Sequence, residues 1–306
     1  MKRPLIYLII ILLIIVIGGY IYLPKQLTIS SAGILKTPYF GILRNIQDTQ
    51  IFKTLGFINS NKNESIKLSY KLENINYDGS HFVINSPYSQ TPLNGSIIEF
   101  RNDSSLIYLS QQYSKTYQPL KVFYNYFKAV HEKQKQEQLI DSFELYLNNL
   151  EYLYGIKPQF DTVRYTEFIS DNTEFNTRPT TAQIYQLINP LQQYILNNKI
   201  KILTPPMLNL RALENNKYFV QVAFGIDTLK ISPFRYKPKK MIKGNLLTAT
   251  VKGDYLAVDK SLQSLEKFIR DSKMSSPAIH FQYLISNRLE QTDSSQWITI
   301  INYPIY

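Results

Sequence analysis

The 306-residue sequence contains no cysteine, which excludes disulfides, thiol catalysis, iron–sulfur clusters and cysteine zinc sites. Its three histidines, His81, His131 and His280, lie far apart and form no H-x-x-H or H-E-x-x-H pattern. A Walker loop, a dinucleotide fingerprint and a nucleophile elbow are also missing from the sequence. We therefore expect no metal site and no cofactor, and we interpret the histidines as surface or packing residues.

The chain has one tryptophan but 24 tyrosines and 16 phenylalanines, and 44% of its residues are hydrophobic. This composition is typical of a folded protein with aromatic side chains available for cavity walls. The length favours two domains, because single cores rarely grow beyond about 250 residues.

The net charge of +11 arises from Lys and Arg residues that are scattered along the chain. No motif that reads DNA or RNA accompanies them, so we expect no nucleic-acid partner. The densest basic run, "RYKPKKMIKG" from Arg235, is interpreted as a solvated linker rather than a phosphate or lipid-headgroup contact.

Residues 4–24 carry no charge, and about 20 apolar residues in a helix cover the roughly 30 Å hydrocarbon core of a bilayer. The aromatic stretch from Tyr20 to Leu23 occupies the place of the small residues that a signal-peptide cleavage site needs. Residues 1–25 are therefore predicted to be an uncleaved transmembrane anchor, with residues 5–23 in the membrane. Lys2 and Arg3 before the span favour a single-pass protein of a bacterial membrane, with its C-terminal domains on the outer, periplasmic side.

Residues 26–155 are predicted to form an antiparallel sheet covered by a long helix. Alternating apolar residues indicate a strand at 27–35, a helix is expected to start at Pro38, and four further strands follow. A hairpin turn is expected at Asn102–Ser104. The stretch 119–154 has the pattern of one amphipathic helix. Its predicted inner face is Phe123, Phe127, Val130, Ile140, Phe143, Leu147 and Leu150.

This order of elements resembles the helix-grip domain of the SRPBCC family, which includes START-like and polyketide-cyclase-type proteins. The segment "LPKQLTISSAGILKTPYFGILRNIQDTQIFKTL", from Leu23, is similar to that family's opening strand, its helix at a proline-containing turn and its short second helix. One difference is that the family often has a tryptophan motif where this chain reads "FKTLGFINSNK". The resemblance implies an apolar cavity between the long helix and the sheet for a lipid or another hydrophobic molecule.

Residues 156–306 contain the same unit twice: a strand, a helix, a proline-containing break and two further strands. Three apolar helix positions repeat with an offset of 74 residues, Leu191, Tyr194 and Ile195 in the first copy and Leu265, Phe268 and Ile269 in the second. In the next strand the alignment places Leu208 and Leu210 on Ile279 and Phe281, with an offset of 71.

One such unit leaves its sheet too exposed to be stable alone, so the two copies are predicted to form one sheet with both helices on one face. The other face is then a concave surface shared by the copies. We expect a cleft with pseudo-two-fold symmetry there, as the place for a small ligand.

The second half resembles the GyrI-like effector-binding domain of some AraC- and MerR-type regulators. The similar segments are "TATVKGDYLAVDKSLQSLEKFI", "SPAIHFQYL" and the ending "WITIINYPIY". The resemblance implies a ligand that is hydrophobic and often cationic, and some relatives hydrolyse small reactive molecules with a glutamate and a tyrosine. Many relatives have a buried glutamate four residues before the final proline, where this chain has Ile300.

The predicted fold class is α+β, with a transmembrane helix (1–25), a helix-grip antiparallel sheet domain (26–155) and a duplicated strand-helix-strand-strand domain with a pseudo-two-fold cleft (156–306). The predicted function is non-enzymatic binding of a small hydrophobic or amphipathic molecule. The candidate ligand-binding residues are Glu167, Tyr255, Tyr283, Trp297 and Tyr303. The four aromatic residues are chosen because rings with polar tips suit an amphipathic pocket. Glu167 is chosen because it is the acidic residue in a strand comparable to the one that carries the relatives' glutamate, a countercharge for a cation.

Two alternatives stay open. In the first, the protein is a hydrolase of small hydrophobic or reactive compounds, with Glu167 and a tyrosine such as Tyr255 as an acid–base pair. In that case Glu167 should point into the cleft, whereas as an ordinary edge residue it should face solvent. In the second, neither cavity is occupied and the chain is a structural partner of another membrane protein.

Overall fold

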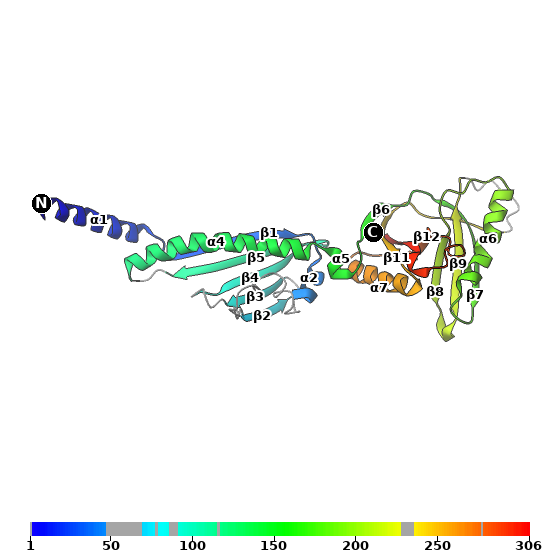
Figure 1. Cartoon of the computed structure of the whole chain (residues 1–306), viewed down its shortest axis with the longest axis horizontal. Coiled ribbons are helices and arrows are strands. Elements are labelled where there is room, and N and C mark those ends of the chain that lie inside the picture. The colour runs from blue at the N-terminus through cyan, green and yellow to red at the C-terminus, as the bar shows by residue number, and fades with distance from the viewer. Residues whose placement is uncertain are drawn as a thin grey trace. The chain divides into compact units, whose positions relative to one another are not determined.

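A computed structural model describes residues 2–46, 69–76, 79–85, 91–114, 117–227, 236–276 and 278–306. The chain divides into two compact units, Met1–Asn149 and Leu150–Tyr306 (Figure 1). Both units combine helices with antiparallel sheets, which confirms the predicted α+β class. The predicted second short helix of the first unit, Arg235 of the basic run and the proline break at Pro277 lie outside the described residues.

The first unit holds a five-stranded antiparallel sheet in the order β1-β5-β4-β3-β2. Its elements are α1 (Lys2–Tyr22), β1 (Gln26–Leu35), α2 (Tyr39–Ile46), β2 (Ser69–Asn76), β3 (Gly79–Asn85), β4 (Leu93–Arg101), β5 (Ser104–Ser114) and α4 (Pro119–Leu147). The expected strand, the helix after Pro38 and the hairpin turn between β4 and β5 are confirmed.

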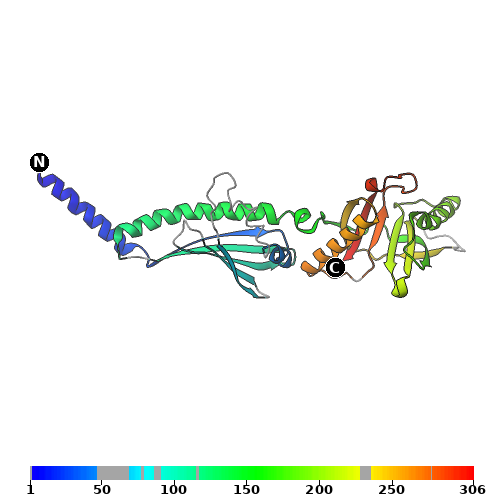
Figure 2. The ribbon, with the colours of Figure 1, turned by 60° about the horizontal axis from the view of Figure 1, so that its bottom comes forward.

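Helix α4 lies along this sheet, as Figure 2 shows, and buries one side against it. The buried positions recur at helical spacing and are Val122, Ala129, Gln136, Ile140, Phe143 and Leu147. The predicted inner face is therefore right for its second half and wrong for its first, since Phe127 is 72% exposed and Val130 is 53% exposed. The first turns carry apolar residues on both sides of the helix, so periodicity did not distinguish the two sides.

The helix is also shorter than predicted, because α4 ends at Leu147 and a separate helix, α5 (Leu150–Tyr154), begins the second unit. The break at Asn148 is stabilised from outside the helix. The Asn148 side chain accepts a hydrogen bond from the backbone N–H of Lys36, and Thr37 donates to the Leu147 carbonyl. Such partners satisfy polar groups at a helix end and fix where it stops.

Close packing in the first unit depends on glycine at two positions. A Cβ on Gly33 of β1 would lie 2.4 Å from a methyl of Ile140 in α4, and one on Gly95 of β4 would lie 2.1 Å from the ring of Phe82 in β3. Carbon atoms attract each other best at about 3.5–4.0 Å, so both distances mean a severe clash. Between β1, β5 and the start of α4 lies a cavity of about 20 Å³, which is room for about one water.

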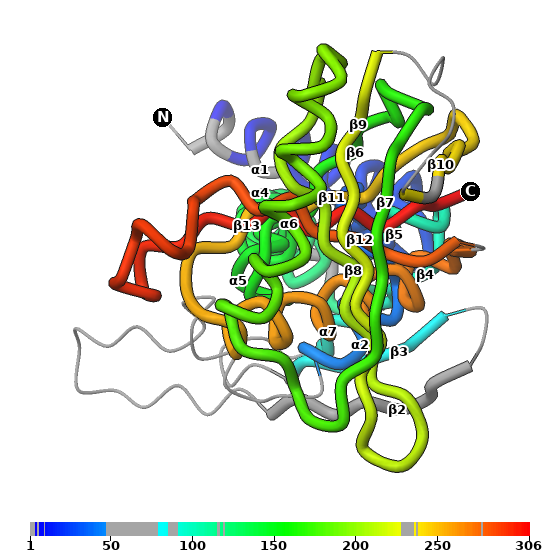
Figure 3. The backbone as a smooth tube through the Cα atoms, turned by 90° about the vertical axis from the view of Figure 1, so that its right-hand side faces the viewer, coloured from blue at the N-terminus to red at the C-terminus, as the bar shows by residue number. Residues whose placement is uncertain are grey.

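The second unit is one eight-stranded antiparallel sheet in the order β10-β7-β9-β8-β12-β13-β11-β6 (Figure 3). Its strands are β6 (Gln159–Thr162), β7 (Glu167–Phe175), β8 (Met207–Ala212), β9 (Tyr218–Gly225), β10 (Lys237–Lys240), β11 (Asn245–Lys252), β12 (Phe281–Leu284) and β13 (Ile298–Ile305). Its helices besides α5 are α6 (Thr181–Asn197) and α7 (Tyr255–Asp271), with the short turns η2 (Glu214–Asn216) and η3 (Ser294–Gln296).

The strand order is symmetric about the β8–β12 pair, with β7-β9-β8 from the first copy facing β12-β13-β11 from the second. The outermost strands are exchanged: β6 leads the first copy but pairs with β11, and β10 leads the second copy but pairs with β7. Gln159 and Lys237 start β6 and β10, and Glu167 and Asn245 start β7 and β11, both 78 residues apart. The predicted duplication is confirmed and extends to these edge strands. The basic run, predicted to be a linker, contains β10.

Both helices lie on the same face of this sheet, as predicted. Helix α6 packs on β7, β8 and β9 through one buried apolar cluster, and α7 packs on β11 and β13 through another. The apolar helix positions that repeat with an offset of 74 point into these clusters, which confirms that alignment.

The strand alignment with an offset of 71 is wrong. The second strands of the two copies begin at Met207 and Phe281, an offset of 74, and these two residues share one apolar cluster. Leu208 and Leu284 belong to the cluster on the helix face, whereas Ile279 lies before β12 and is exposed. An odd error in offset exchanges the two faces of a strand, because successive side chains alternate.

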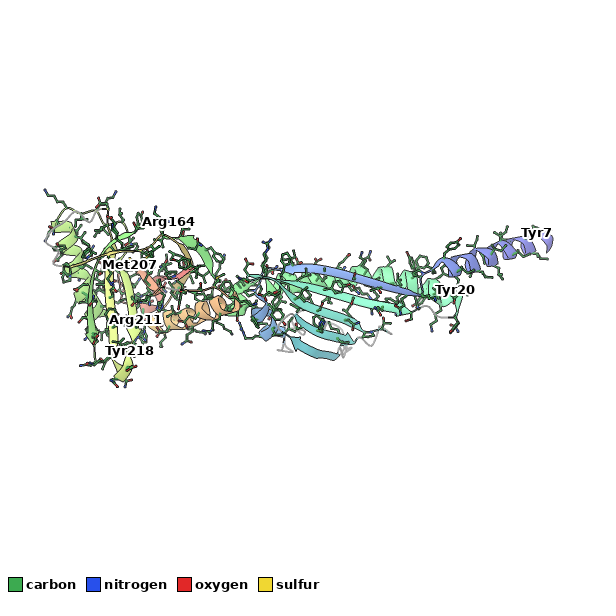
Figure 4. The ribbon with its side chains drawn as sticks, turned by 180° about the vertical axis from the view of Figure 1, so that it is seen from behind. Tyr7, Tyr20, Arg164, Met207, Arg211 and Tyr218 are labelled. Atoms are coloured by element: carbon green, nitrogen blue, oxygen red, sulfur yellow. The ribbon has the colours of Figure 1, made fainter. Side chains whose placement is uncertain are left out.

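Over the part of the chain that the structure describes, no helix combines the length and the apolar character that a membrane crossing needs. Helix α1, with Tyr7 near its start and Tyr20 near its end (Figure 4), is the segment that was predicted to cross. The structure therefore gives the predicted transmembrane anchor no support.

We expect Gly95→Ala to destabilise the first unit by about 1–3 kcal/mol, because the added methyl would overlap the buried ring of Phe82. The matched control is Gly244→Ala, since nothing lies within 4 Å of a Cβ built at Gly244. Urea unfolding followed by circular dichroism measures both. Equal unfolding curves for Gly95→Ala and the wild type would show that β3 and β4 are not packed in this way.

Candidate functional site

A cavity of about 440 Å³ lies between the two repeats of the second unit, on the face of the sheet that carries the helices. Its walls are the first turns of α6 and α7, and its floor is β8, β12 and the loop that follows β12. Both copies contribute, so neither repeat forms the cavity alone. The cleft between the repeats was predicted on the face opposite the helices, and both copies do line two smaller hollows there. The cavity of about 440 Å³ lies on the other face, where none was predicted.

The floor of the cavity follows from the way in which the two half-sheets meet. Strands β8 and β12 pair through only two residue pairs, Met207 with Tyr283 and Leu208 with Gln282. Side chains alternate between faces, so Leu208 and Gln282 point to the helix face and Met207 and Tyr283 point away. Leu208, Leu210 and Gln282 line the cavity, which gives it an apolar floor with one buried amide.

The two helix starts are fixed by local sequence. Thr180 caps α6 with a capping box, in which its hydroxyl accepts from the backbone N–H of Gln183 and the Gln183 side chain accepts from the backbone N–H of Thr180. Asp254 caps α7 by accepting a hydrogen bond of 3.0 Å from the backbone N–H of Ala257. Thr180 and Asp254 both line the cavity, so the N-terminal ends of two helices border it.

Arg178, just before α6, joins the two walls. Its Nη1 and Nη2 donate to Asp259 Oδ2 and Oδ1 of α7 at 2.8 Å and 3.1 Å, as a bidentate ion pair between the repeats. The Arg178 guanidinium carbon also lies 4.6 Å from the centre of the Tyr255 ring. A partly exposed pair of this kind contributes about 1 kcal/mol or less to stability. Its main effects are to hold the Tyr255 ring and to neutralise both charges.

Arg288, in the loop after β12, has a different environment. It is only 8% exposed and lines the cavity. Its Nη2 donates to Thr299 Oγ1 at 2.7 Å, its guanidinium carbon lies 5.0 Å from the centre of the Trp297 ring, and its Nε is buried without a hydrogen-bond partner. Burial lowers the pKa of Arg288, since removing a cation from water disfavours its charged form.

The loop that carries Arg288 is held at several points. The hydroxyl of Tyr185 in α6 accepts a hydrogen bond of 2.9 Å from the backbone N–H of Arg288. The indole Nε1 of Trp297 donates to the carbonyl of Gln291 at 2.7 Å, and Ser286 Oγ accepts from the backbone N–H of Ile298 at 2.9 Å. These contacts position Arg288 and Trp297 against each other without the help of a ligand.

This loop is also where the two repeats differ most. In the first copy the connection between the last two strands covers residues 213–217, whereas in the second copy it covers residues 285–297. The additional residues include Arg288 and end at Trp297. The symmetric scaffold therefore carries an asymmetric cavity.

The face opposite the helices has two neighbouring hollows, of about 200 Å³ and about 300 Å³, around a cluster that includes Phe168, Met207 and Phe281. Tyr283 lines the larger of these two. Burial, followed by the nearby charge of Asp161, raises the pKa of Tyr283 to about 12.

The five predicted site residues do not converge. Tyr255 and Trp297 share the cavity on the helix face, whereas Tyr283 lies on the other face. Glu167 forms an ion pair with its cross-strand neighbour Lys240, with 3.8 Å between Oε1 and Nζ. Tyr303 packs against α7, where its hydroxyl donates to Glu266 Oε1 at 3.4 Å.

His280 also has a packing role, as expected, because its ring stacks on Tyr303 with 5.3 Å between centroids. Burial lowers its pKa. Among the described residues, no group of three or more His, Cys, Asp or Glu side chains could hold a metal ion.

Sequence reasoning missed Arg178, Asp259 and Arg288, which give the cavity its charge. Arg288 lies just before residues 290–295, whose composition indicates only a polar turn. One signal was available in the sequence, because comparing the two copies shows that the second turn is longer than the first. An insertion in one copy of a repeat marks a loop that is free to acquire a function.

Comparison with known proteins gives no match to a family model, and no curated protein matches the chain. Solved structures do match. The C-terminal domain of EcmrR is 15% identical, with 49% of this chain and 98% of that chain covered and a TM-score of 0.42. SAV2435 bound to tetraphenylphosphonium is 14% identical, with 49% and 94% covered and a TM-score of 0.34.

The di-domain ARO/CYC protein StfQ from the steffimycin biosynthetic pathway is 6% identical, with 90% of this chain and 83% of that chain covered and a TM-score of 0.23. All three TM-scores are below 0.5, which is too low to assign the chain to a family or to transfer a ligand to it. The resemblances to the SRPBCC and GyrI-like families therefore stay hypotheses.

Tyr283 offers a test of the packing on the second face. A tyrosine whose pKa rises from 10.0 to about 12 on folding stabilises the fold below pH 10, and this contribution is lost as the pH rises towards 12. We expect the unfolding free energy of Tyr283→Phe to fall less steeply between pH 10 and pH 12 than that of the wild type. Parallel curves from urea unfolding at a series of pH values would contradict the burial of Tyr283.

Proposed function

We propose that the second unit binds a small amphipathic molecule in the cavity between its two repeats, and that the chain acts as a binding protein. The observation that carries this proposal is the cavity of about 440 Å³ with walls from both copies. This volume is in the range of about 300–1,000 Å³ that is typical of small-molecule sites. An apolar floor with a few convergent polar groups is the usual composition of such sites.

The side chains around the cavity suit a ligand with an aromatic or aliphatic body. Ile184, Leu208 and Val258 supply buried apolar surface, and the rings of Tyr255 and Trp297 supply flat walls. The two rings are held in place by Arg178 and Arg288, which lie over them. Rigid walls lose little conformational entropy when a ligand binds, so less of the binding free energy is spent on ordering these side chains.

The hydrolase alternative has no support in the geometry. Its proposed acid–base pair was Glu167 with a tyrosine such as Tyr255. In the structure the Glu167 carboxylate is next to Lys240 on β10, and the Tyr255 ring is next to Arg178. A general base has to reach the proton that it removes. Non-enzymatic binding is thus the function that we propose.

The filled variant Leu210→Phe tests the site. Leu210 lines the cavity and is only partly buried, so the larger ring should occupy ligand space. We expect the neutral probe 4-phenylbutanamide to change the emission of Trp297, the only tryptophan in the chain, in a saturable way. In Leu210→Phe the affinity should fall by about tenfold or more, a typical penalty for lost space in an apolar pocket.

The matched control is Leu213→Phe, the same change three residues further along the chain, just outside β8 and away from the cavity lining. It should bind the probe like the wild type. Equal affinity in the wild type and Leu210→Phe would place the probe outside this cavity and contradict the proposal.

Membrane attachment through residues 5–23, with the domains that follow the span on the periplasmic side of a bacterial membrane, stays a prediction from the sequence. It depends on the uncharged run and on Lys2 and Arg3 before it. We expect a reporter that fluoresces only in the cytoplasm to stay dark when it is fused to the C-terminus of the full chain. A bright fusion would show that this prediction is wrong.

A further inference from the structure

We propose that the cavity between the repeats selects an anionic ligand, a small carboxylate or sulfonate with an apolar body, and that Arg288 is the residue that recognises its charge. This inference rests on the proposed function and adds the chemical class of the ligand. It is opposite in sign to the cationic ligands that the resemblance to GyrI-like domains implied.

The main observation is that Arg288 is a buried cation without a carboxylate beside it. Its side chain is more than nine-tenths buried, and its one described side-chain hydrogen bond goes to a neutral group, the hydroxyl of Thr299. None of the ion pairs found among the described residues includes Arg288, and its Nε lacks a hydrogen-bond partner. A charge buried in this way has lost its hydration, and one hydrogen bond to a neutral group does not offset the desolvation free energy.

Arg178 shows what a satisfied guanidinium looks like in the same cavity. It is more exposed than Arg288, yet it holds a bidentate carboxylate, Asp259, at 2.8 Å and 3.1 Å. Each arginine lies over one aromatic ring, Tyr255 for Arg178 and Trp297 for Arg288. Arg178 has a carboxylate partner in Asp259, whereas Arg288 has no carboxylate partner among the described residues. A ligand carboxylate or sulfonate would supply it.

The other charged groups around the cavity do not cancel this preference. The two acidic side chains in its lining are Asp259, which is paired with Arg178, and Asp254, which caps α7. Asp254 offsets the positive end of the α7 dipole, whereas α6 is capped by the neutral Thr180, so its positive end adds to the field of Arg288.

The loop keeps the charge in place before any ligand arrives. The backbone of Arg288 is fastened to Tyr185, and the indole of Trp297 is fastened to Gln291. Two donors on the guanidinium edge match the two oxygens of a carboxylate in geometry. The apolar floor at Leu208 and Leu210 leaves space for the body of the ligand.

Three probes of equal size and different charge test this proposal: 4-phenylbutyrate, 4-phenylbutanamide and 4-phenylbutylammonium. Each is titrated into the full chain and followed by the emission of Trp297, whose ring lies beside Arg288. We expect the carboxylate to bind at least about tenfold more tightly than the amide, because it forms an ion pair with the guanidinium in addition to the hydrogen bonds that both probes can accept. The ammonium should bind more weakly than the amide.

Arg288→Met is the central variant, and it should abolish the preference for the carboxylate, so that the carboxylate no longer binds more tightly than the amide. Replacing an unpaired buried ion by an apolar side chain is often neutral or stabilising, so its melting temperature should not fall below that of the wild type. Arg288→Lys keeps the charge and should keep the preference, which gives a second reading should the Met variant fail to fold. Arg164→Met is the matched control, since Arg164 lines the hollow on the opposite face.

The outcomes separate this inference from the proposed function. Equal affinities for the three probes, tightest binding of the ammonium, or loss of the preference in Arg164→Met instead of Arg288→Met would overturn the anion proposal. The proposed function would still stand in those cases if Leu210→Phe weakened all three probes. No saturable change with any probe would overturn both.

Discussion

The architecture of the second unit depends on one short junction, the pairing of β8 with β12. Two residue pairs, Met207 with Tyr283 and Leu208 with Gln282, connect the two half-sheets at their centre. The exchanged edge strands reinforce this junction, because β6 is hydrogen-bonded to the second copy and β10 to the first. Strands β10 and β6 thus cover β7 and β11 and form the two edges of the sheet. The continuous sheet then positions both helices, and with them the walls of the cavity.

A symmetric scaffold explains where the cavity is but not what it holds. The helix starts, the floor strands and the edge strands all have a counterpart in the other copy. The charged groups do not. Arg178 and Asp259 cancel each other across the walls, whereas Arg288 lies in the loop 285–297, which is longer than its counterpart 213–217. The duplicated fold forms the cavity, and the longer loop in the second copy adds the buried cation Arg288 to it.

The sequence predicted those parts of the fold in which burial follows a regular period. The helix positions Leu191 and Leu265 repeat because each helix needs one apolar face against its half-sheet. Prediction failed where apolar residues lie on more than one side of a helix, and where a strand consists mainly of polar residues. The first half of α4 is apolar on two sides, and β10 is a strand of lysines around Pro238, a composition that an edge strand tolerates.

The aromatic residues of the candidate site could be predicted from the sequence, but its charged residues could not. Tyr255 and Trp297 were chosen because aromatic rings suit cavity walls, but the choice of Glu167 relied on a countercharge for a cation. In the structure the buried charge that lacks an ion-pair partner among the described residues of the cavity is a cation, Arg288. Nothing in the run "SNRLEQTDSSQW" shows that Arg288 is buried, since burial there results from Tyr185 of the other repeat and from Trp297. A buried cation without a carboxylate partner costs stability, and a bound anion would offset that cost.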